Sequence, residues 1–137
     1  MAPPFLQTVL VVEDDRAVLR VVTLILKEAG FKILAANNGS EATGLAAGYP
    51  GMIHLLLSDV DMPDISGPDL ALVLKAVRPE MRVILMSGHA DGALLVLNYG
   101  WHFITKPFLA GMLVSVVKDV LAGPSREQGT DHFDARL

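Results

Sequence analysis

The segment over residues 55–63 constrains the fold more than any other. It reads Leu-Leu-Leu-Ser-Asp-Val-Asp-Met-Pro, so an uninterrupted apolar run ends in two carboxylates and a proline. Apolar runs of this kind, bounded by turn signals, are typical of a central parallel strand that is covered on both faces. Ligands of open parallel sheets bind just beyond the carboxyl ends of the strands. We therefore expect Asp59 to lie at the functional edge of a sheet.

Apolar runs alternate with amphipathic segments along the rest of the chain. The pattern predicts strands over 9–12, 31–35, 53–58, 83–86 and 102–105, and helices over 16–29, 41–47, 68–78, 91–98 and 109–121. Strands and helices that alternate at this spacing form right-handed βαβ units. We expect an α/β fold, (βα)5, in which a doubly wound parallel sheet of five strands has helices on both faces.

Helix ends and helix faces can also be predicted from this pattern. Asp15 is expected to cap the first helix and Ser40 the second, since short polar side chains accept the first free N–H groups. In the third helix, the spacing i, i+3, i+4, i+7 predicts a buried apolar face, formed by Leu70, Val73, Leu74 and Val77.

Length and composition indicate one domain without staples. We expect a lead-in over 1–7, a domain over 8–122 and a polar, disordered tail over 123–137. The absence of cysteine excludes disulfides and thiolate sites and fits a reducing cytoplasm. The net charge of −4, without a basic cluster, argues against nucleic acid as a partner.

A membrane location is not expected either. The longest apolar run, Phe108 to Val117, is too short to span a bilayer. The first four residues, Met-Ala-Pro-Pro, lack the positive region with which a signal peptide begins.

Four predicted strand ends bring polar groups to one edge of the sheet. These groups are Glu13 and Asp14, Asp59, Ser87, and Lys106. Three carboxylates at one place repel one another, and a divalent cation such as Mg²⁺ relieves the repulsion because it prefers oxygen ligands. A carboxylate nucleophile, a metal, a lysine and a hydroxyl together are suited to phosphoryl transfer.

At this point the chain resembles a known family, the receiver domains of bacterial two-component response regulators. The resemblance covers about residues 8–122 and rests on four motifs in order: 9–15 (Val-Leu-Val-Val-Glu-Asp-Asp), 58–63 with Gly67, 84–88 (Ile-Leu-Met-Ser-Gly) and 103–108 (Phe-Ile-Thr-Lys-Pro-Phe). Residues 81–108 look most like the receivers at the C-terminus of hybrid sensor histidine kinases. The resemblance also implies the sheet order 2-1-3-4-5.

The resemblance implies a role for each residue of the site. Asp59 would be the phosphoacceptor, taking a phosphoryl group from a phosphohistidine. Mg²⁺ would be held by Asp14 directly, by Glu13 through water, by Asp59, and by the main-chain carbonyl of Asp61. Lys106, which precedes a proline whose peptide bond is usually cis in this family, would hold a phosphoryl oxygen.

Two further residues would form the switch. Ser87 takes the position of the hydroxyl that moves to the phosphoryl group, and Phe103 that of the aromatic residue that turns with it. The sequence departs from the family in two places. Gly88 stands where alanine is common, and Phe103 replaces a frequent tyrosine, so a switch through a phenol hydrogen bond is excluded.

The implied activity is signalling rather than turnover of a substrate. The phosphoryl transfer to Asp59 would be self-catalysed, so the domain is expected not to be an enzyme in its own right. A sensor histidine kinase or a phosphotransfer protein is the expected partner, in the cytoplasm. The apolar run over 93–97 and the narrow polar edge of the last helix favour self-association, as a homodimer, through the fourth helix, fifth strand and fifth helix.

Two other functions remain open from the residues alone. Asp59-x-Asp61 after a strand echoes the nucleophile motif of haloacid dehalogenase-type phosphatases, but their acid pair comes last in the chain and here it comes first. A flavodoxin-like cofactor binder needs a hydroxyl-rich phosphate loop after the first strand, where this chain has three acids. The histidines His54, His89, His102 and His132 lack a shared ligand spacing, which argues against zinc.

Overall fold

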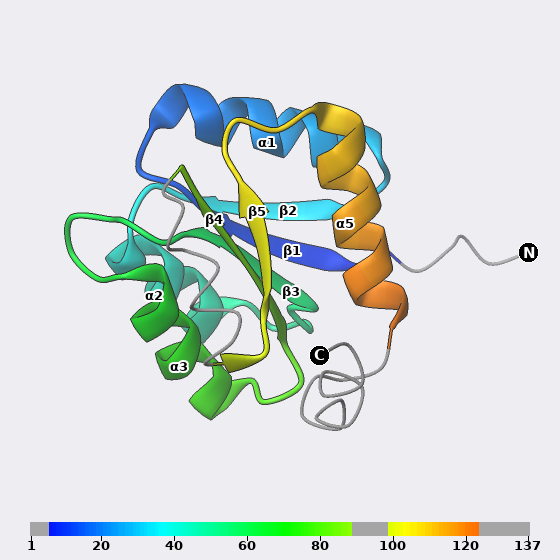
Figure 1. Ribbon diagram of the computed structural model, residues 1–137. Coiled ribbons are helices and arrows are strands. Elements are labelled where there is room, and N and C mark those ends of the chain that lie inside the picture. The colour runs from blue at the N-terminus through cyan, green and yellow to red at the C-terminus, as the bar shows by residue number, and fades with distance from the viewer. Residues whose placement is uncertain (1–5, 89–98, 124–137) are drawn as a thin grey trace, which may run out of the picture.

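The computed structural model describes residues 6–88 and 99–123, and within them five parallel strands form one sheet (Figure 1). The strands are β1 (Thr8–Val12), β2 (Lys32–Ala36), β3 (Leu55–Asp59), β4 (Arg82–Ser87) and β5 (His102–Thr105). Their order in the sheet is β2-β1-β3-β4-β5, as the resemblance implied. The α/β fold class is thereby confirmed.

Helices cover both faces of this sheet (Figure 1). They are α1 (Arg16–Glu28), α2 (Gly39–Gly48), α3 (Gly67–Val77) and α5 (Ala110–Ala122). In Figure 1, α1 and α5 lie on one face and α2 and α3 on the other. The helix expected over 91–98 falls outside the described residues, so the labels pass from α3 to α5.

The two layers explain why the central strands are apolar at every position. In β1, Val9 and Val11 belong to the core cluster under α1 and α5, whereas Leu10 and Val12 belong to the cluster under α2 and α3. All five residues of β1 and all five of β3 are buried. Successive side chains of a strand point to opposite faces, so a strand covered on both sides has no solvent face.

The register of the sheet brings the strand ends level with one another. Val12 pairs with Ser58, so the acids that follow β1 lie beside Asp59. Asp59 in turn pairs with Met86, and Ser87 pairs with Thr105. The carboxyl ends of β1, β3, β4 and β5 therefore meet at one edge of the sheet, as expected from the sequence.

One local prediction was wrong in part and another was wrong. Leu70 and Leu74 lie on the buried face of α3 as predicted, but Ala71 completes that face, whereas Val73 is 49% exposed and Val77 is 72% exposed. The small Ala71 lets α3 approach its neighbours along a different stripe from the one that its valines mark. The cap of α2 is Asn38, whose side chain accepts the Glu41 N–H at 2.8 Å, and not Ser40. The predicted cap of α1, Asp15, is confirmed, since its carboxylate accepts the N–H groups of Ala17 and Val18.

In the part of the chain that the structure describes, no helix is both long and apolar enough to cross a bilayer.

Candidate functional site

Three carboxylates meet at the edge where β1 and β3 end. Each of Glu13, Asp14 and Asp59 offers an oxygen that lies within 4.8 Å of the others, so one ion can contact all three. Glu13 is 1% exposed and Asp59 is 7% exposed, whereas Asp14 faces solvent. The cluster is therefore buried at Glu13 and Asp59 and open to solvent at Asp14, which suits a cation that keeps some of its water.

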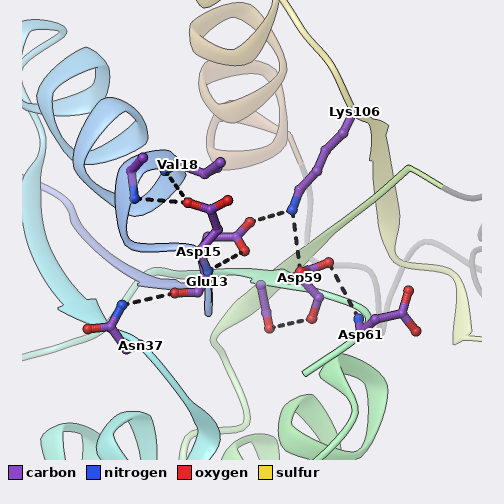
Figure 2. A network of polar contacts seen from close by, with 9 residues as sticks. Glu13, Asp15, Val18, Asn37, Asp59, Asp61 and Lys106 are labelled. Atoms are coloured by element: carbon purple, nitrogen blue, oxygen red, sulfur yellow. Dashed lines mark hydrogen bonds and ion pairs between the residues drawn. The ribbon is translucent and has the colours of Figure 1, made fainter. Parts of the chain in front are cut away.

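Lys106, which follows β5, pairs with two acids of the cluster. Its ammonium group forms an ion pair with Asp59 Oδ2 at 3.3 Å and a hydrogen-bonded ion pair with Glu13 Oε1 (Figure 2). The main-chain N–H of Lys106 donates to the Ser87 carbonyl at 2.9 Å. The peptide bond between Lys106 and Pro107 is cis, which confirms the prediction.

The electrostatics of this cluster reflect burial and charge together. Burial raises the pKa of Glu13, and the hydrogen bonds from Lys106 and from the Asp15 N–H offset only part of that effect. Burial alone would lower the pKa of Lys106, but its hydrogen bond to Glu13 and the charge of Asp59 outweigh burial and raise it. The lysine therefore stays charged and partly compensates the acids, and a divalent cation can compensate the rest.

Backbone contacts fix the segment that carries Asp59. The Asp61 N–H points at Asp59 Oδ1 at 3.4 Å, and the Ser58 hydroxyl donates to the Asp59 carbonyl at 2.9 Å. Asp61 itself is exposed.

The two expected switch residues lie on β4 and β5. Ser87 is buried at the end of β4, and Phe103 is half-buried on β5, where it packs against the core cluster under α2 and α3. His89 falls outside the described residues. Glu13, Asp14, Asp59, Asp61, Ser87 and Lys106 thus come from the strand ends of one edge, whereas Phe103 lies inside β5, where it pairs with Leu85.

Two residues near the site were missed from the sequence. Asn37 follows β2 and donates through Nδ2 to the Glu13 carbonyl at 3.3 Å (Figure 2). Asp64 lies in the loop after β3 and accepts N–H groups from Gly39 and Ser40 of α2. The only sequence signal for either one is its position in a polar turn after a strand.

The donor set fits Mg²⁺. All the converging ligand atoms are oxygens, and no histidine or sulfur ligand joins the cluster among the described residues. Mg²⁺ prefers such hard ligands and binds through one or two carboxylates while it keeps several waters.

Comparison with known proteins identifies the family. The family model described as "response regulator receiver domain" matches residues 9–118. The chain belongs to the receiver domains of the two-component response regulators.

Individual relatives extend this result. The chain is 33% identical over 117 residues to the sensor kinase CckA of Brucella abortus, covering 83% of this chain and 12% of that protein. It is 37% identical over 129 residues to the transcriptional regulatory protein FixJ of Azorhizobium caulinodans, covering 92% of this chain and 59% of FixJ. The chain therefore spans less than two thirds of the length of these relatives.

Solved structures agree with the fold. The receiver domain of the hybrid histidine kinase CckA superposes with a TM-score of 0.72 at 34% identity, covering 83% of this chain and 98% of that one. A receiver domain from Clostridium thermocellum gives a TM-score of 0.78 at 27% identity, covering 85% of this chain and 95% of that one.

Proposed function

We propose that this domain is the phosphoacceptor of a two-component phosphorelay, in which Asp59 receives a phosphoryl group from a phosphohistidine in a Mg²⁺-dependent step. The observation that carries the proposal is the meeting of Asp59 with two further carboxylates and one lysine at a single sheet edge. Receiver-family membership supports it independently.

The chemistry follows from the positions of the side chains. A carboxylate oxygen of Asp59 attacks the phosphorus, the phosphorus–nitrogen bond of the phosphohistidine breaks, and the imidazole leaves with the electron pair and takes up a proton. The ammonium of Lys106, 3.3 Å from Asp59 Oδ2, stabilises the negative charge on the transferred phosphoryl oxygens. Mg²⁺, held by Asp14, Asp59, the Asp61 carbonyl and, through water, Glu13, would supply the remaining charge neutralisation.

Under this proposal the domain acts on itself and is not an enzyme with a separate substrate. After transfer, the Ser87 hydroxyl moves to the phosphoryl group and Phe103 turns with it. The half-buried state of Phe103 supports such a change, because the side chain has both core and solvent on its sides.

A protein donor needs a surface beside the site, and the structure offers one. A groove of about 520 Å³ runs along α1 next to Lys106, and it is lined by Ala17, Val18, Val21, Val22, Lys106, Pro107 and Phe108. We propose that a helix of a sensor histidine kinase or a phosphotransfer protein packs here through apolar side chains. That contact would bring its phosphohistidine to Asp59.

Further features of the proposal follow the family resemblance. We propose a cytoplasmic location and, in view of the likeness to CckA, an origin in a hybrid histidine kinase. We also propose that phosphorylation promotes a homodimer through the face of β5 and α5, on which Leu109 and Met112 are exposed. The fourth helix of that face lies outside the described residues. Light scattering with and without beryllofluoride tests the dimer.

Intact-mass spectrometry after incubation with acetyl phosphate and Mg²⁺ tests the central claim. The protein should gain the mass of one phosphoryl group, and Asp59→Asn should not. As a matched control, Asp61→Asn keeps the main-chain carbonyl and should still be labelled. Labelling that persists in Asp59→Asn would place the acceptor elsewhere. Steady turnover of a generic phosphate ester would favour the phosphatase alternative instead.

A further inference from the structure

The acids of the site lie on two separate segments, residues 13–15 after β1 and residues 59–61 after β3. Backbone pairing between β1 and β3 ends at Val12 and Ser58, just before the acids begin. A metal that contacts both segments needs a fixed separation between them. Residues 37–41, at the start of α2, contact the first segment and the loop that follows the second segment.

Asn37 forms the contact with the first segment. Its Nδ2 donates to the Glu13 carbonyl at 3.3 Å, and Figure 2 shows this side chain reaching toward Glu13 from the end of β2. The Glu13 N–H donates to the Ala36 carbonyl at 3.1 Å, so the acid-bearing backbone is held on both sides of Glu13.

Asp64, in the loop that follows the second segment, forms the other contact of residues 37–41. Its two carboxylate oxygens accept the N–H of Gly39 at 3.2 Å and the N–H of Ser40 at 3.0 Å. These are free N–H groups at the start of α2, where a negative charge is favourable. The hydrogen bond from Gly39 is the main reason why the pKa of Asp64 is lowered, so the carboxylate is charged at neutral pH.

The loop between the acids and Asp64 is closed at its base. The Gly67 N–H donates to the Val60 carbonyl at 2.8 Å, and the Val60 N–H donates to the Met86 carbonyl at 2.9 Å. Residues 60–67 therefore form a pinned loop, and Asp64 joins the middle of that loop to α2. The side chain of Ile65 packs directly against Gly39, where an added Cβ would lie 2.1 Å from Cγ2 of Ile65.

Hydrogen bonds within residues 37–41 hold this turn in place. Asn38 Oδ1 accepts the Glu41 N–H at 2.8 Å, and Glu41 Oε1 accepts the Asn37 N–H at 2.7 Å. This reciprocal pair holds residues 37–41 in one conformation. Residues 37–41 therefore link Glu13 to the loop over 60–67, and a movement of that loop away from Glu13 would break a hydrogen bond of Asn37 or of Asp64.

We propose that Asn37 and Asp64 are positioning residues for the divalent cation, which together with residues 38–41 form a brace between the acid-bearing segment 13–15 and the loop over 60–67 that follows Asp59 and Asp61. The brace sets the separation at which Asp14, Asp59 and the Asp61 carbonyl face one ion. This inference rests on the proposed function, because a positioning role requires that these acids bind a cation. Loss of a group that is hydrogen-bonded to a metal ligand typically weakens metal binding by about tenfold or more, and we expect an effect of this order here.

Calorimetric titration with Mg²⁺ measures the effect without any phosphoryl transfer. Asp64→Ala should raise the dissociation constant for Mg²⁺ by about tenfold. Asp64→Asn keeps one oxygen acceptor and should show a smaller rise. Asn37→Ala removes the other contact and should act in the same direction. The matched control is Asp69→Ala, which removes an exposed carboxylate from the first turn of α3 that makes no contact with α2 in the hydrogen bonds described above.

Labelling with acetyl phosphate provides a second readout. In Asp64→Ala the Mg²⁺ concentration for half-maximal labelling should rise, while the rate at saturating Mg²⁺ stays near that of the wild type. A role in stability alone would lower the melting temperature and leave the Mg²⁺ midpoint unchanged.

The outcomes separate this inference from the proposed function. Wild-type protein that binds Mg²⁺ and is labelled on Asp59, together with an Asp64→Ala midpoint equal to that of Asp69→Ala, overturns the brace alone. Wild-type protein that neither binds Mg²⁺ nor is labelled overturns the proposed function. Should Asp64→Ala fail to fold, Asp64→Asn and Asn37→Ala carry the test, and unchanged affinity in both rejects the brace.

Discussion

The α-carbon of Gly67 packs against the carbonyl oxygen of Asp59, so closely that a Cβ at residue 67 would lie 2.3 Å from that oxygen. Gly67 is the first residue of α3, and Asp59 is the last residue of β3. The start of α3 is therefore in contact with the backbone of the proposed phosphoacceptor. Only a residue without a side chain permits this approach.

Replacing Gly67 by alanine should destabilise the domain and disturb the site. The added methyl group meets backbone atoms, which cannot rotate away, so the loop over 60–67 must shift. We expect a loss of about 1–3 kcal/mol in the free energy of unfolding, the usual cost of overpacking. Chemical denaturation measures this loss, and acetyl phosphate labelling should slow because the shifted loop carries Asp61.

Gly44→Ala is the matched control for that substitution. Gly44 lies inside α2, and an added Cβ there meets nothing within 4 Å. Alanine should stabilise this helix by about 0.5–1 kcal/mol, because it loses less backbone entropy than glycine. If both variants were equally stable, the close approach at Gly67 would have no energetic consequence.

Mg²⁺ should raise the melting temperature of the wild-type protein. A ligand that binds only the folded state stabilises it by mass action, by about 2.7 kcal/mol when its concentration is a hundred times the dissociation constant. Asp14→Ala and Asp59→Asn should each reduce this response, since each removes a carboxylate from the cluster. Thermal melts with and without millimolar Mg²⁺ measure it, with Ca²⁺-free buffer and Asp69→Ala as controls. A wild-type melt that ignores Mg²⁺ would contradict the metal site.

The sequence was sufficient to predict that the candidate acids and the lysine converge, because they stand at strand ends. Parallel strands place their carboxyl ends at one edge, so Asp59 and Lys106 could be brought together without coordinates. The brace through Asn37 and Asp64 could not be predicted in this way. Asp64 bonds to Gly39 and Ser40, which are 25 and 24 residues away, and no local spacing marks a contact between two loops.

The face of α3 shows the other limit of sequence patterns. Two sets of residues on this helix have the spacing of a buried apolar face. One is the predicted set, Leu70, Val73, Leu74 and Val77, and the other is the observed set, Leu70, Ala71 and Leu74. The choice between them depends on the helices and strands that α3 contacts. The size of a side chain does not predict its burial here, because the small Ala71 is buried and the larger Val77 is exposed.

The corrected face of α3 predicts unequal costs for two truncations. Leu74 is 2% exposed, so Leu74→Ala should lower the free energy of unfolding by about 2–5 kcal/mol. Val77→Ala should change it by no more than about 0.5 kcal/mol, because Val77 is largely in solvent. Denaturant unfolding of the two variants measures both values. Similar losses of stability would indicate that Val77 is buried, as the spacing of the sequence predicted.

A negative charge introduced into the groove along α1 should slow transfer from a protein donor without changing the rate of labelling by a small-molecule donor. Val21 lines this groove and is 53% exposed, so Val21→Glu should be tolerated by the fold. It should slow transfer from a phosphorylated histidine phosphotransfer domain by about tenfold, equivalent to roughly 1.4 kcal/mol of binding. Labelling by acetyl phosphate, which needs no docking surface, should not change.

The control for Val21→Glu lies on the opposite face of the sheet. Val73 of α3 has a similar exposure, and Val73→Glu adds the same charge. If Val73→Glu slowed the protein donor as much as Val21→Glu, the donor would not dock along α1.

We expect His54 to make the stability of the domain depend on pH, independently of the acidic cluster. At the end of the sheet opposite to that site, the Thr8 N–H donates to Nδ1 of His54 at 2.9 Å, and the His54 N–H donates to the Thr8 carbonyl at 2.9 Å. A protonated Nδ1 cannot accept this hydrogen bond, so protonation breaks one of the two hydrogen bonds described here between Thr8 and His54. Burial lowers the pKa of His54 below its ordinary value of 6.5.

The sign of the effect follows from this lowered pKa. The unfolded chain binds the proton more readily than the folded one, so the contribution of His54 to stability is complete above pH 6.5. It is lost progressively as the pH falls from there through the lowered pKa of the folded state.

His54→Asn places an amide oxygen near the position of Nδ1. This oxygen can accept the Thr8 N–H and does not titrate. Denaturant unfolding between about pH 7.5 and pH 5 should show the wild type losing stability relative to His54→Asn, in the direction that linkage requires. Parallel stability curves for the two proteins over that range would show that His54 titrates alike in the folded and unfolded states.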